Sequence, residues 1–261
     1  MSLRPLLVPI VWLLGLSGVH CHRESDAAAL ITRASSSVRS DVGSSADMWH
    51  YAVDAGRARV DMAGIKEDIQ GDASRADGVL DVAPREMGAS RATIRVDLAT
   101  FATHTFHDDR DATQTKHART WLEVQVGDSL NEKMRWAEFI VRSIGDLSAS
   151  DLTQVHAAER GGQDVRTVEM TVHGDLLLHG HVVPKDARVV ASFYYPMGAA
   201  PSSKPTRIEI DSKDPLHVVL KEHDVGPRDP KGQVLAWSAQ LITKVAETAN
   251  VSIHVGAAPA F

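Results

Sequence analysis

Thr93-Ile94-Arg95-Val96-Asp97-Leu98 is the stretch that decides the fold class. Apolar and polar residues alternate along it, and a period of two residues is typical of a β-strand with one buried face. The same alternation occurs at 49–53, 58–62 and 78–82, and Asp54-Ala55-Gly56 between the first two is a predicted turn. The chain therefore contains several half-buried strands.

Further candidate strands follow along the chain. They lie at 138–144, 166–173, 175–178, 188–195, 206–211, 216–221 and 251–255. Gly, Asp, Asn and Pro separate consecutive strands, which is the pattern of an antiparallel meander. The polar face of the alternating strands argues against a parallel sheet that is buried on both sides. The sequence predicts a mainly β domain with an antiparallel sheet.

Two segments favour helix. Residues 111–124 are polar, with Trp121 and Leu122 near the end, and predict at most a short surface helix. In 234–249, apolar residues recur at intervals of three and four without an intervening Gly or Pro, which places one apolar stripe along a helix. We expect this segment to be the one longer helix, near the C-terminus, lying against the sheet before the last strand.

The N-terminal residues are typical of an export signal. Arg4 precedes an apolar stretch at 6–16 that is too short to span a bilayer and suits a signal peptide. The sole cysteine, Cys21, stands where a lipoprotein carries its acylated thiol, and lipidation there would tether the chain to a membrane. Cleavage after Ser17 is the alternative. We expect a signal peptide at 1–21, which could also be a lipoprotein signal, and a periplasmic or outer-envelope location.

The next segment links this signal to the folded domain. Residues 22–47 are polar and rich in Ser and Ala, and they lack a sustained apolar stripe. Such a composition predicts a flexible tether. The single folded domain is then expected at 48–257.

Charge and motifs exclude several classes of function. The 261 residues carry 28 Lys and Arg against 34 Asp and Glu, and a net charge of −6 argues against nucleic-acid binding. One cysteine forbids an intrachain disulfide. The chain has no nucleophile elbow, phosphate-binding loop or dinucleotide fingerprint, and residues 224–229 are typical of a turn. We therefore expect no enzyme activity, no catalytic residues and no cofactor.

Short motifs follow one another in a fixed order along the domain. They are Tyr51-Ala52-Val53-Asp54, Gly78-Val79-Leu80-Asp81, Val96-Asp97-Leu98-Ala99-Thr100-Phe101-Ala102-Thr103, Trp121-Leu122-Glu123-Val124, Ala137-Glu138-Phe139 and Gly174-Asp175-Leu176-Leu177-Leu178-His179-Gly180-His181-Val182-Val183-Pro184. Over about Trp49 to Val255, this order resembles the YceI-like family of lipid- and polyisoprenoid-binding proteins of the bacterial envelope. The resemblance implies a lipocalin-like antiparallel barrel of about eight strands, with an apolar lumen that holds an isoprenoid or fatty lipid.

The physical chemistry of such a barrel agrees with this implication. Closure removes the edges of the sheet, and eight strands leave an interior that can hold one small ligand. Each buried five-carbon unit contributes roughly 3–4 kcal/mol before ordering costs, at ~0.8 kcal/mol per CH₂.

Apolar character and strand position predict which residues line the lumen. They are Leu98, Phe101, Phe139, Val141, Leu176, Leu178, Val190 and Phe193. The members of two pairs, Leu98 with Phe101 and Val190 with Phe193, are three residues apart, so each pair shares a face only if a bulge or a strand end intervenes. Trp121 and Trp136 flank a polar connection, where they either close the mouth of the barrel or serve as packing anchors.

The histidines point to a different function. The chain has thirteen histidines. Two residues separate His104 from His107, and His179 and His181 would share one face of a strand. Zinc needs three or four such ligands, usually with a carboxylate. Neither pair makes a recognised signature, so no metal ligand is assigned. A histidine-based metal-binding envelope protein and a structural or interaction module with a filled barrel stay as alternatives, and homodimerisation is left open.

Overall fold

The computed structural model describes residues 48–63, 68–126, 129–228 and 247–260. The predicted signal peptide at 1–21 with Cys21, the predicted tether at 22–47 and residues 234–246 of the predicted C-terminal helix lie outside the described residues. Within the described ranges, no helix is both long enough and apolar enough to cross a membrane.

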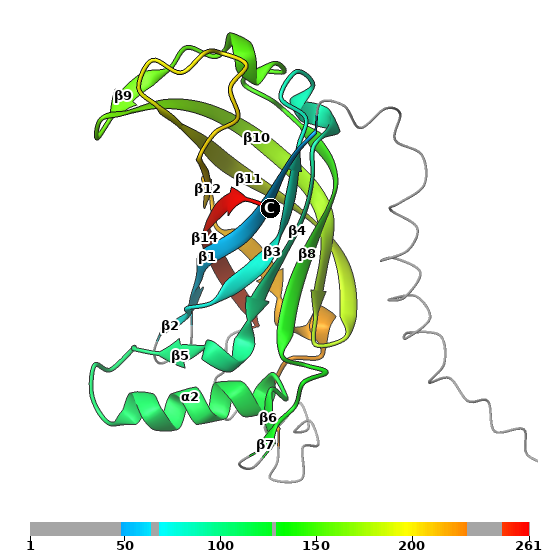
Figure 1. The fold of residues 1–261 in the computed structure, drawn as a ribbon. Coiled ribbons are helices and arrows are strands. Elements are labelled where there is room, and N and C mark those ends of the chain that lie inside the picture. The colour runs from blue at the N-terminus through cyan, green and yellow to red at the C-terminus, as the bar shows by residue number, and fades with distance from the viewer. Residues whose placement is uncertain (1–47, 64–67, 127–128, 229–246, 261) are drawn as a thin grey trace, which may run out of the picture. The chain divides into compact units, whose positions relative to one another are not determined.

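Eight antiparallel strands form a closed barrel (Figure 1). In order around the barrel they are β1 (Trp49–Met62), β3 (Ala76–Val82), β4 (Arg91–Asp97), β8 (Trp136–Gly145), β10 (Gln163–Leu178), β11 (His181–Pro196), β12 (Arg207–Ser212) and β14 (Thr248–Pro259). The ring closes because β14 pairs with β1 along most of its length. The predicted mainly β, antiparallel barrel is confirmed.

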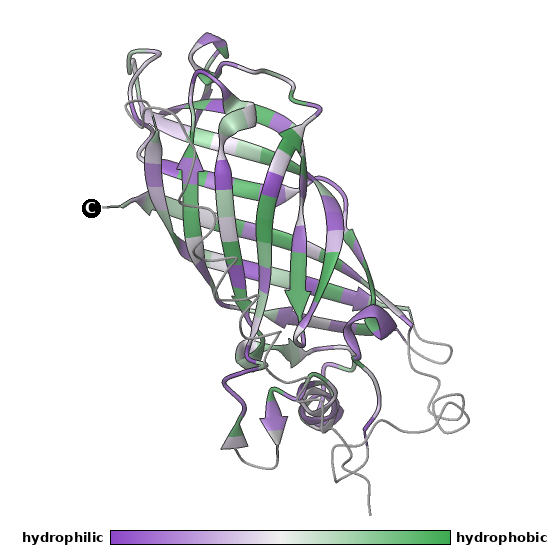
Figure 2. Cartoon of the chain, turned by 90° about the vertical axis from the view of Figure 1, so that its right-hand side faces the viewer, coloured by the Kyte–Doolittle hydropathy of each residue, from purple (hydrophilic) through white to green (hydrophobic). Residues whose placement is uncertain are grey.

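Smaller elements accompany the barrel strands, and two of them form a separate two-stranded sheet. The short strands are β2 (Ile69–Ala73), β5 (Ala102–Thr103), β6 (Gln125–Val126), β7 (Ser129–Leu130), β9 (Ala158–Arg160) and β13 (Leu216–Val219). The helices are α2 (Arg110–Trp121) and the 3₁₀ turns η2 (Met87–Ala89), η3 (Leu98–Thr100), η4 (Leu152–Gln154) and η5 (Leu220–His223). Figure 2 shows apolar and polar residues alternating along the barrel strands, as the sequence predicts.

The predicted turn at residues 54–56 is a β-bulge inside one continuous strand. β1 pairs with β14 on both sides of a register shift between Val53 and Ala55. The first half of β1 pairs with β3 and the second half with β2. At the change of partner, a Cβ on Gly56 would lie 2.3 Å from the Cβ of Ala76, so only glycine fits there. The turn residues therefore bend a strand instead of ending it.

Within the described ranges, the longer helix does not lie near the C-terminus, and residues 234–246 of the segment predicted to form it are not among the described residues. That helix is α2, in the middle of the chain, and it overlaps residues 111–124, where we expected at most a short surface helix. Thr248 and Ala249, at the end of the predicted helix, lie in β14 opposite β13. Ala249 is buried in a core cluster with Val218 and Leu220, so this apolar position packs from a strand.

The two ends of the barrel differ. At the helix end, α2 lies below the strands (Figure 1), and Arg119 Nε donates a hydrogen bond to the carbonyl of Phe101 over 2.9 Å. The opposite end is packed with fully buried side chains, including Tyr51, Leu152 and Tyr195. An interior space is therefore closed by core packing at one end and bordered by α2 and the neighbouring loops at the other.

Candidate functional site

An apolar cavity of about 240 Å³ lies inside the barrel. Every barrel strand contributes to its wall: Val60, Leu80, Ile94, Val141, Leu176, Phe193, Ile208 and Val251 come from the eight strands in turn. The polar residues of the lining are Asp81, Ser90, Arg91, Glu138 and Ser212, and all other lining residues are apolar. Such a wall favours an apolar occupant, because a polar group placed there finds few hydrogen-bond partners.

The cavity, which we call the slot, has lining residues that follow one another along the strands. Its lining includes Met170 near the middle of β10 and Leu178 at the end of the same strand. The eight steps between them extend roughly 26 Å at ~3.3 Å per residue. A volume of about 240 Å³ that extends over much of this length suits an extended chain better than a compact molecule.

Most of the predicted lining residues border the cavity. They are Leu98, Phe101, Phe139, Val141, Leu176, Leu178 and Phe193. Leu98 and Phe101 share the inner face because η3 intervenes between them, as their spacing required. Contact of these side chains with a ligand stays a prediction.

Val190 is the exception, and its assignment to the lumen is wrong. Its neighbours Val189 and Ala191 are buried and line the cavity, whereas Val190 is half-buried and does not. β11 is regular here, pairing without a register shift with β10 and β12, so inner positions follow every second residue. Val189, Ala191 and Phe193 are in phase, which leaves Val190 on the outer face.

A buried carboxylate holds η3 in place. Asp97 is 1% exposed, and its side chain accepts a hydrogen bond from the backbone N–H of Ala99 over 3.1 Å, which caps the turn. Arg135 donates two further hydrogen bonds to the same carboxylate, over 3.0 and 2.7 Å. These bonds to Arg135 hold the pKa of Asp97 below its usual range. Asp97 thereby fixes the turn that directs Leu98 and Phe101 into the cavity.

A glycine makes room for the ring of Phe139. The register between β10 and β8 shifts between His173 and Gly174. A Cβ on Gly174 would lie 2.6 Å from a ring carbon of Phe139 and from the carbonyl oxygen of Ile140. The ring lies directly over the glycine backbone, and this close approach requires the missing side chain.

The two tryptophans that flank the polar connection have different positions. Trp121, the last residue of α2, lines the cavity at the helix end. Trp136 does not line it; the guanidinium groups of Arg75, Arg95 and Arg135 lie 5.8, 4.9 and 5.2 Å from its ring centroid. Trp121 therefore borders the slot, and Trp136 is a packing anchor among cations.

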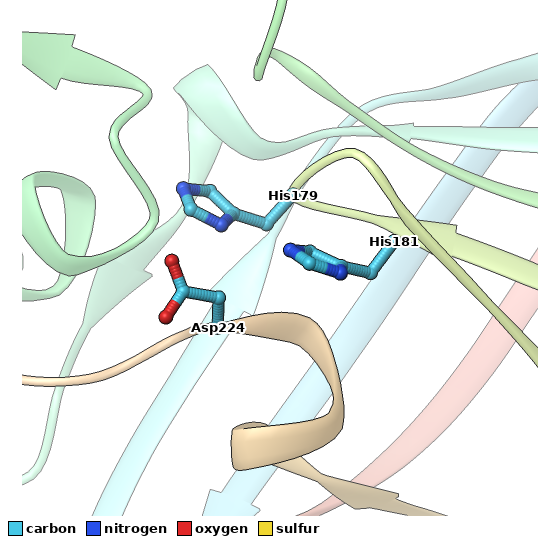
Figure 3. A group of neighbouring side chains, drawn as sticks. All are labelled: His179, His181 and Asp224. Atoms are coloured by element: carbon cyan, nitrogen blue, oxygen red, sulfur yellow. The ribbon is translucent and has the colours of Figure 1, made fainter. Parts of the chain in front are cut away.

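A group of polar side chains lies beside the helix end of the cavity. We define this helix-end cluster as Glu123, His179, His181, Asp224 and Arg228. His179 and His181 were expected on one face of a strand, but His179 lies in the turn between β10 and β11, and the two rings stack across that turn with centroids 6.4 Å apart. Figure 3 shows the two rings beside each other with the Asp224 carboxylate close to His179.

Hydrogen bonds and ion pairs connect the cluster. His179 Nε2 lies 2.9 Å from Oε2 of Glu123, and His179 Nδ1 donates to the carbonyl of His223 over 3.1 Å. Arg228 Nη1 lies 3.3 Å from the Glu123 carboxylate, and Arg228 Nη2 lies 3.0 Å from that of Asp224. Arg228 therefore links the two acidic residues, of which Glu123 also contacts His179.

The other predicted histidine pair has different surroundings. The rings of His104 and His107 are 6.2 Å apart, but the carboxylate of Asp111 accepts backbone hydrogen bonds from Phe106 and His107 at the start of α2. In the described part of the chain, the group of three or more side chains close enough to hold a metal consists of His179, His181 and Asp224. No such group includes His104 or His107 there.

Most of the helix-end cluster was not predicted from the sequence. Glu123 follows α2, and Asp224 and Arg228 belong to the segment that the sequence assigned only to a turn. Glu123, His179 and Asp224 all have positive φ, between 51° and 52°. No spacing signal connects them, because they lie in three loops that only the folded barrel brings together.

No family model matches this chain, and no curated protein is significantly similar to it. Among solved structures, the chain is similar to that of Burkholderia cenocepacia BcnA, at 13% identity over 77% of this chain and 95% of that one, with a TM-score of 0.48. It is also similar to a polyisoprenoid binding domain from Saccharophagus degradans that is implicated in plant cell wall breakdown. That match has 14% identity over 80% and 98% of the two chains and a TM-score of 0.49. At these values, neither similarity assigns a ligand to the cavity.

Proposed function

We propose that this protein binds one long-chain apolar molecule, an isoprenoid-type or other lipid, in the barrel cavity. The observation that carries the proposal is the continuous apolar wall, to which all eight strands contribute. The motif order that resembles the YceI-like family supports the same ligand class. A barrel filled by its own side chains would lack this space, so the cavity argues against a purely structural module.

Binding of such a ligand follows from burial of hydrocarbon. Each CH₂ moved from water into the slot contributes ~0.8 kcal/mol, and the cost of ordering the chain reduces the sum. The lining offers few polar groups that would select a headgroup, so the cavity distinguishes ligands mainly by chain length and width. We infer a carrier or scavenger that does not act as an enzyme.

The place of action is part of the proposal. The apolar stretch at 6–16 after Arg4 supports export by a signal peptide, and Cys21 supports an additional lipid anchor. A lipid-binding barrel in the bacterial envelope has its hydrophobic ligands at hand in the neighbouring membranes. Mass measurement of the mature protein tests the two processing alternatives, because acylation of Cys21 adds the mass of the acyl chains.

Mass spectrometry of an organic extract tests the ligand. The protein purified from its native host is extracted, and we expect hydrophobic molecules of isoprenoid or fatty mass in stoichiometric amount. Ala187→Phe places a ring at a half-buried position of the cavity wall. Since a cavity of about 150 Å³ already takes benzene, the new ring occupies much of the roughly 240 Å³ available.

The matched control is Val190→Phe, because Val190 is on the same strand but does not line the cavity. We expect the Ala187→Phe variant to lose most of its bound lipid and the Val190→Phe variant to keep it, with both variants folded by circular dichroism. Equal lipid content in the two variants, or a wild-type extract without hydrophobic molecules, would refute the proposed binding in the cavity.

A further inference from the structure

We propose that His179, His181 and Asp224 form a binding site for a divalent transition metal such as Zn²⁺. One ligating atom from each residue lies within 4.8 Å of the other two. Imidazole nitrogens and a carboxylate oxygen are a donor set that zinc accepts. This site is separate from the apolar slot and is not needed for lipid binding.

The side chains around His179 already have the arrangement of a metal site. Metal-binding histidines usually donate their second ring N–H to a carboxylate, which fixes the ring and raises the basicity of the ligating nitrogen. His179 Nε2 lies 2.9 Å from the carboxylate of Glu123. Nδ1 is therefore the atom that His179 offers to the metal, in exchange for its hydrogen bond to the carbonyl of His223.

The remaining two ligands are positioned to close on the ion. His181 and Asp224 are exposed, and the ring of His181 stacks on that of His179 at an interplanar angle of 19°. Arg228 Nη2 holds the Asp224 carboxylate at 3.0 Å. Zinc bonds of about 2.0–2.2 Å require the three ligating atoms to lie closer together than they do now. Rotation of the exposed side chains of His181 and Asp224 supplies this movement.

The other described histidines of the barrel do not lie close to two further side chains that could bind the same metal ion. His173 and His254 each pair with one carboxylate, of Asp186 and Asp211, over 2.7 Å. Neither belongs to a group of three possible ligands among the residues that the structure describes. These pairs are therefore suitable internal controls for non-specific binding by exposed imidazole and carboxylate groups.

Zinc binding by the full chain, purified without a histidine tag, tests the proposal. Isothermal titration with ZnCl₂ is combined with metal analysis after dialysis, and we expect one Zn²⁺ per chain. His181→Ala and Asp224→Asn each remove one ligand and should weaken the affinity at least 10-fold. Asn tolerates the left-handed backbone of Asp224, so the second variant keeps the loop conformation.

Two further variants sharpen the test. His173→Ala removes an exposed histidine outside the site and should leave the affinity unchanged. Glu123→Gln keeps an acceptor for His179 but removes its charge, and should weaken binding about 10-fold. Melting curves without metal check that every variant folds.

Two results would overturn the proposal: no stoichiometric zinc in the wild-type chain, or the same affinity in the wild-type, His181→Ala and His173→Ala proteins. The second result also covers zinc that binds to Cys21 and the histidines beside it, because these residues are present in every variant. Lipid content is measured in parallel, so failure of the metal site and failure of the lipid cavity are distinguished.

Discussion

The substitution Asp97→Asn tests whether one buried ion pair sets the geometry of the cavity wall. Asp97 is 1% exposed and accepts hydrogen bonds from two nitrogens of Arg135 and from the backbone of Ala99. Asparagine keeps the shape but removes the charge, and it turns an NH₂ group toward donors. The capping bond to η3 and both charge-assisted bonds are therefore weakened together.

The structure sets the expected magnitude. Removing one partner of a fully buried ion pair costs about 3–5 kcal/mol because the other charge is left unpaired. Arg135 is 23% exposed and keeps its ion pair with Glu132 at 3.1 Å, so its charge retains water and a partner. We therefore expect a loss of about 3 kcal/mol in the free energy of unfolding, at the lower end of that range. For a domain of this size, the melting temperature should fall by roughly 6–12 °C.

The assay is urea or thermal unfolding followed by circular dichroism, with Asp214→Asn as the control. Asp214 also pairs with an arginine, Arg188, at 2.9 Å, but both side chains are more than half exposed. Such surface pairs contribute less than about 1 kcal/mol. A loss for Asp97→Asn that does not exceed that of Asp214→Asn would contradict the assigned role of the buried carboxylate.

Acid provides a second readout of the same group. The pKa of Asp97 is lowered in the folded state, so its contribution is present above the unfolded pKa of about 3.9 and is lost as the pH falls through the folded pKa. The difference in stability between the wild type and Asp97→Asn should therefore be full at pH 7 and shrink below about pH 4. A difference that is constant from pH 7 to pH 2 would be inconsistent with this linkage.

Burial raises the pKa of Glu138 above 4.5, the usual value of a glutamate, so the contribution of this side chain to stability declines as the pH rises from 4.5 through the folded pKa. Glu138→Gln should therefore have a higher melting temperature than the wild type at pH 7 and the same melting temperature at pH 4. A lower melting temperature of the variant at pH 7 would contradict this. Gly174→Ala introduces a Cβ against the ring of Phe139 and should cost about 1–3 kcal/mol in urea unfolding, whereas an unchanged midpoint would show that the ring moves freely. Val189→Asp puts a charge on the cavity wall and should abolish lipid retention and lower the melting temperature. Val190→Asp places the charge on the outer face and should change neither property. Equal effects of the two substitutions would show that the assigned faces of β11 are wrong.

Local sequence determined the strands and most of the buried face. The alternation at 93–98 reports directly which side chains point inward, because successive residues of a strand face opposite sides. Leu98, Phe139 and Leu176 were therefore assigned correctly to the inner face. The error at Val190 arose because apolar character does not fix the phase of a strand whose flanking residues are also apolar. The register of β11 against both of its neighbours fixes it.

The closed ring and the helix-end cluster were decided by the tertiary structure. Closure depends on pairing between β1 and β14, at opposite ends of the described chain, and periodicity carries no information about strand partners. In the same way, Glu123, His179 and Asp224 meet because three loops end at the same rim of the barrel. The sequence by itself specified an apolar face on each strand. Only the packing of all eight around one axis turned those faces into a slot and brought a polar cluster to its edge, because both depend on contacts between residues that are far apart along the chain.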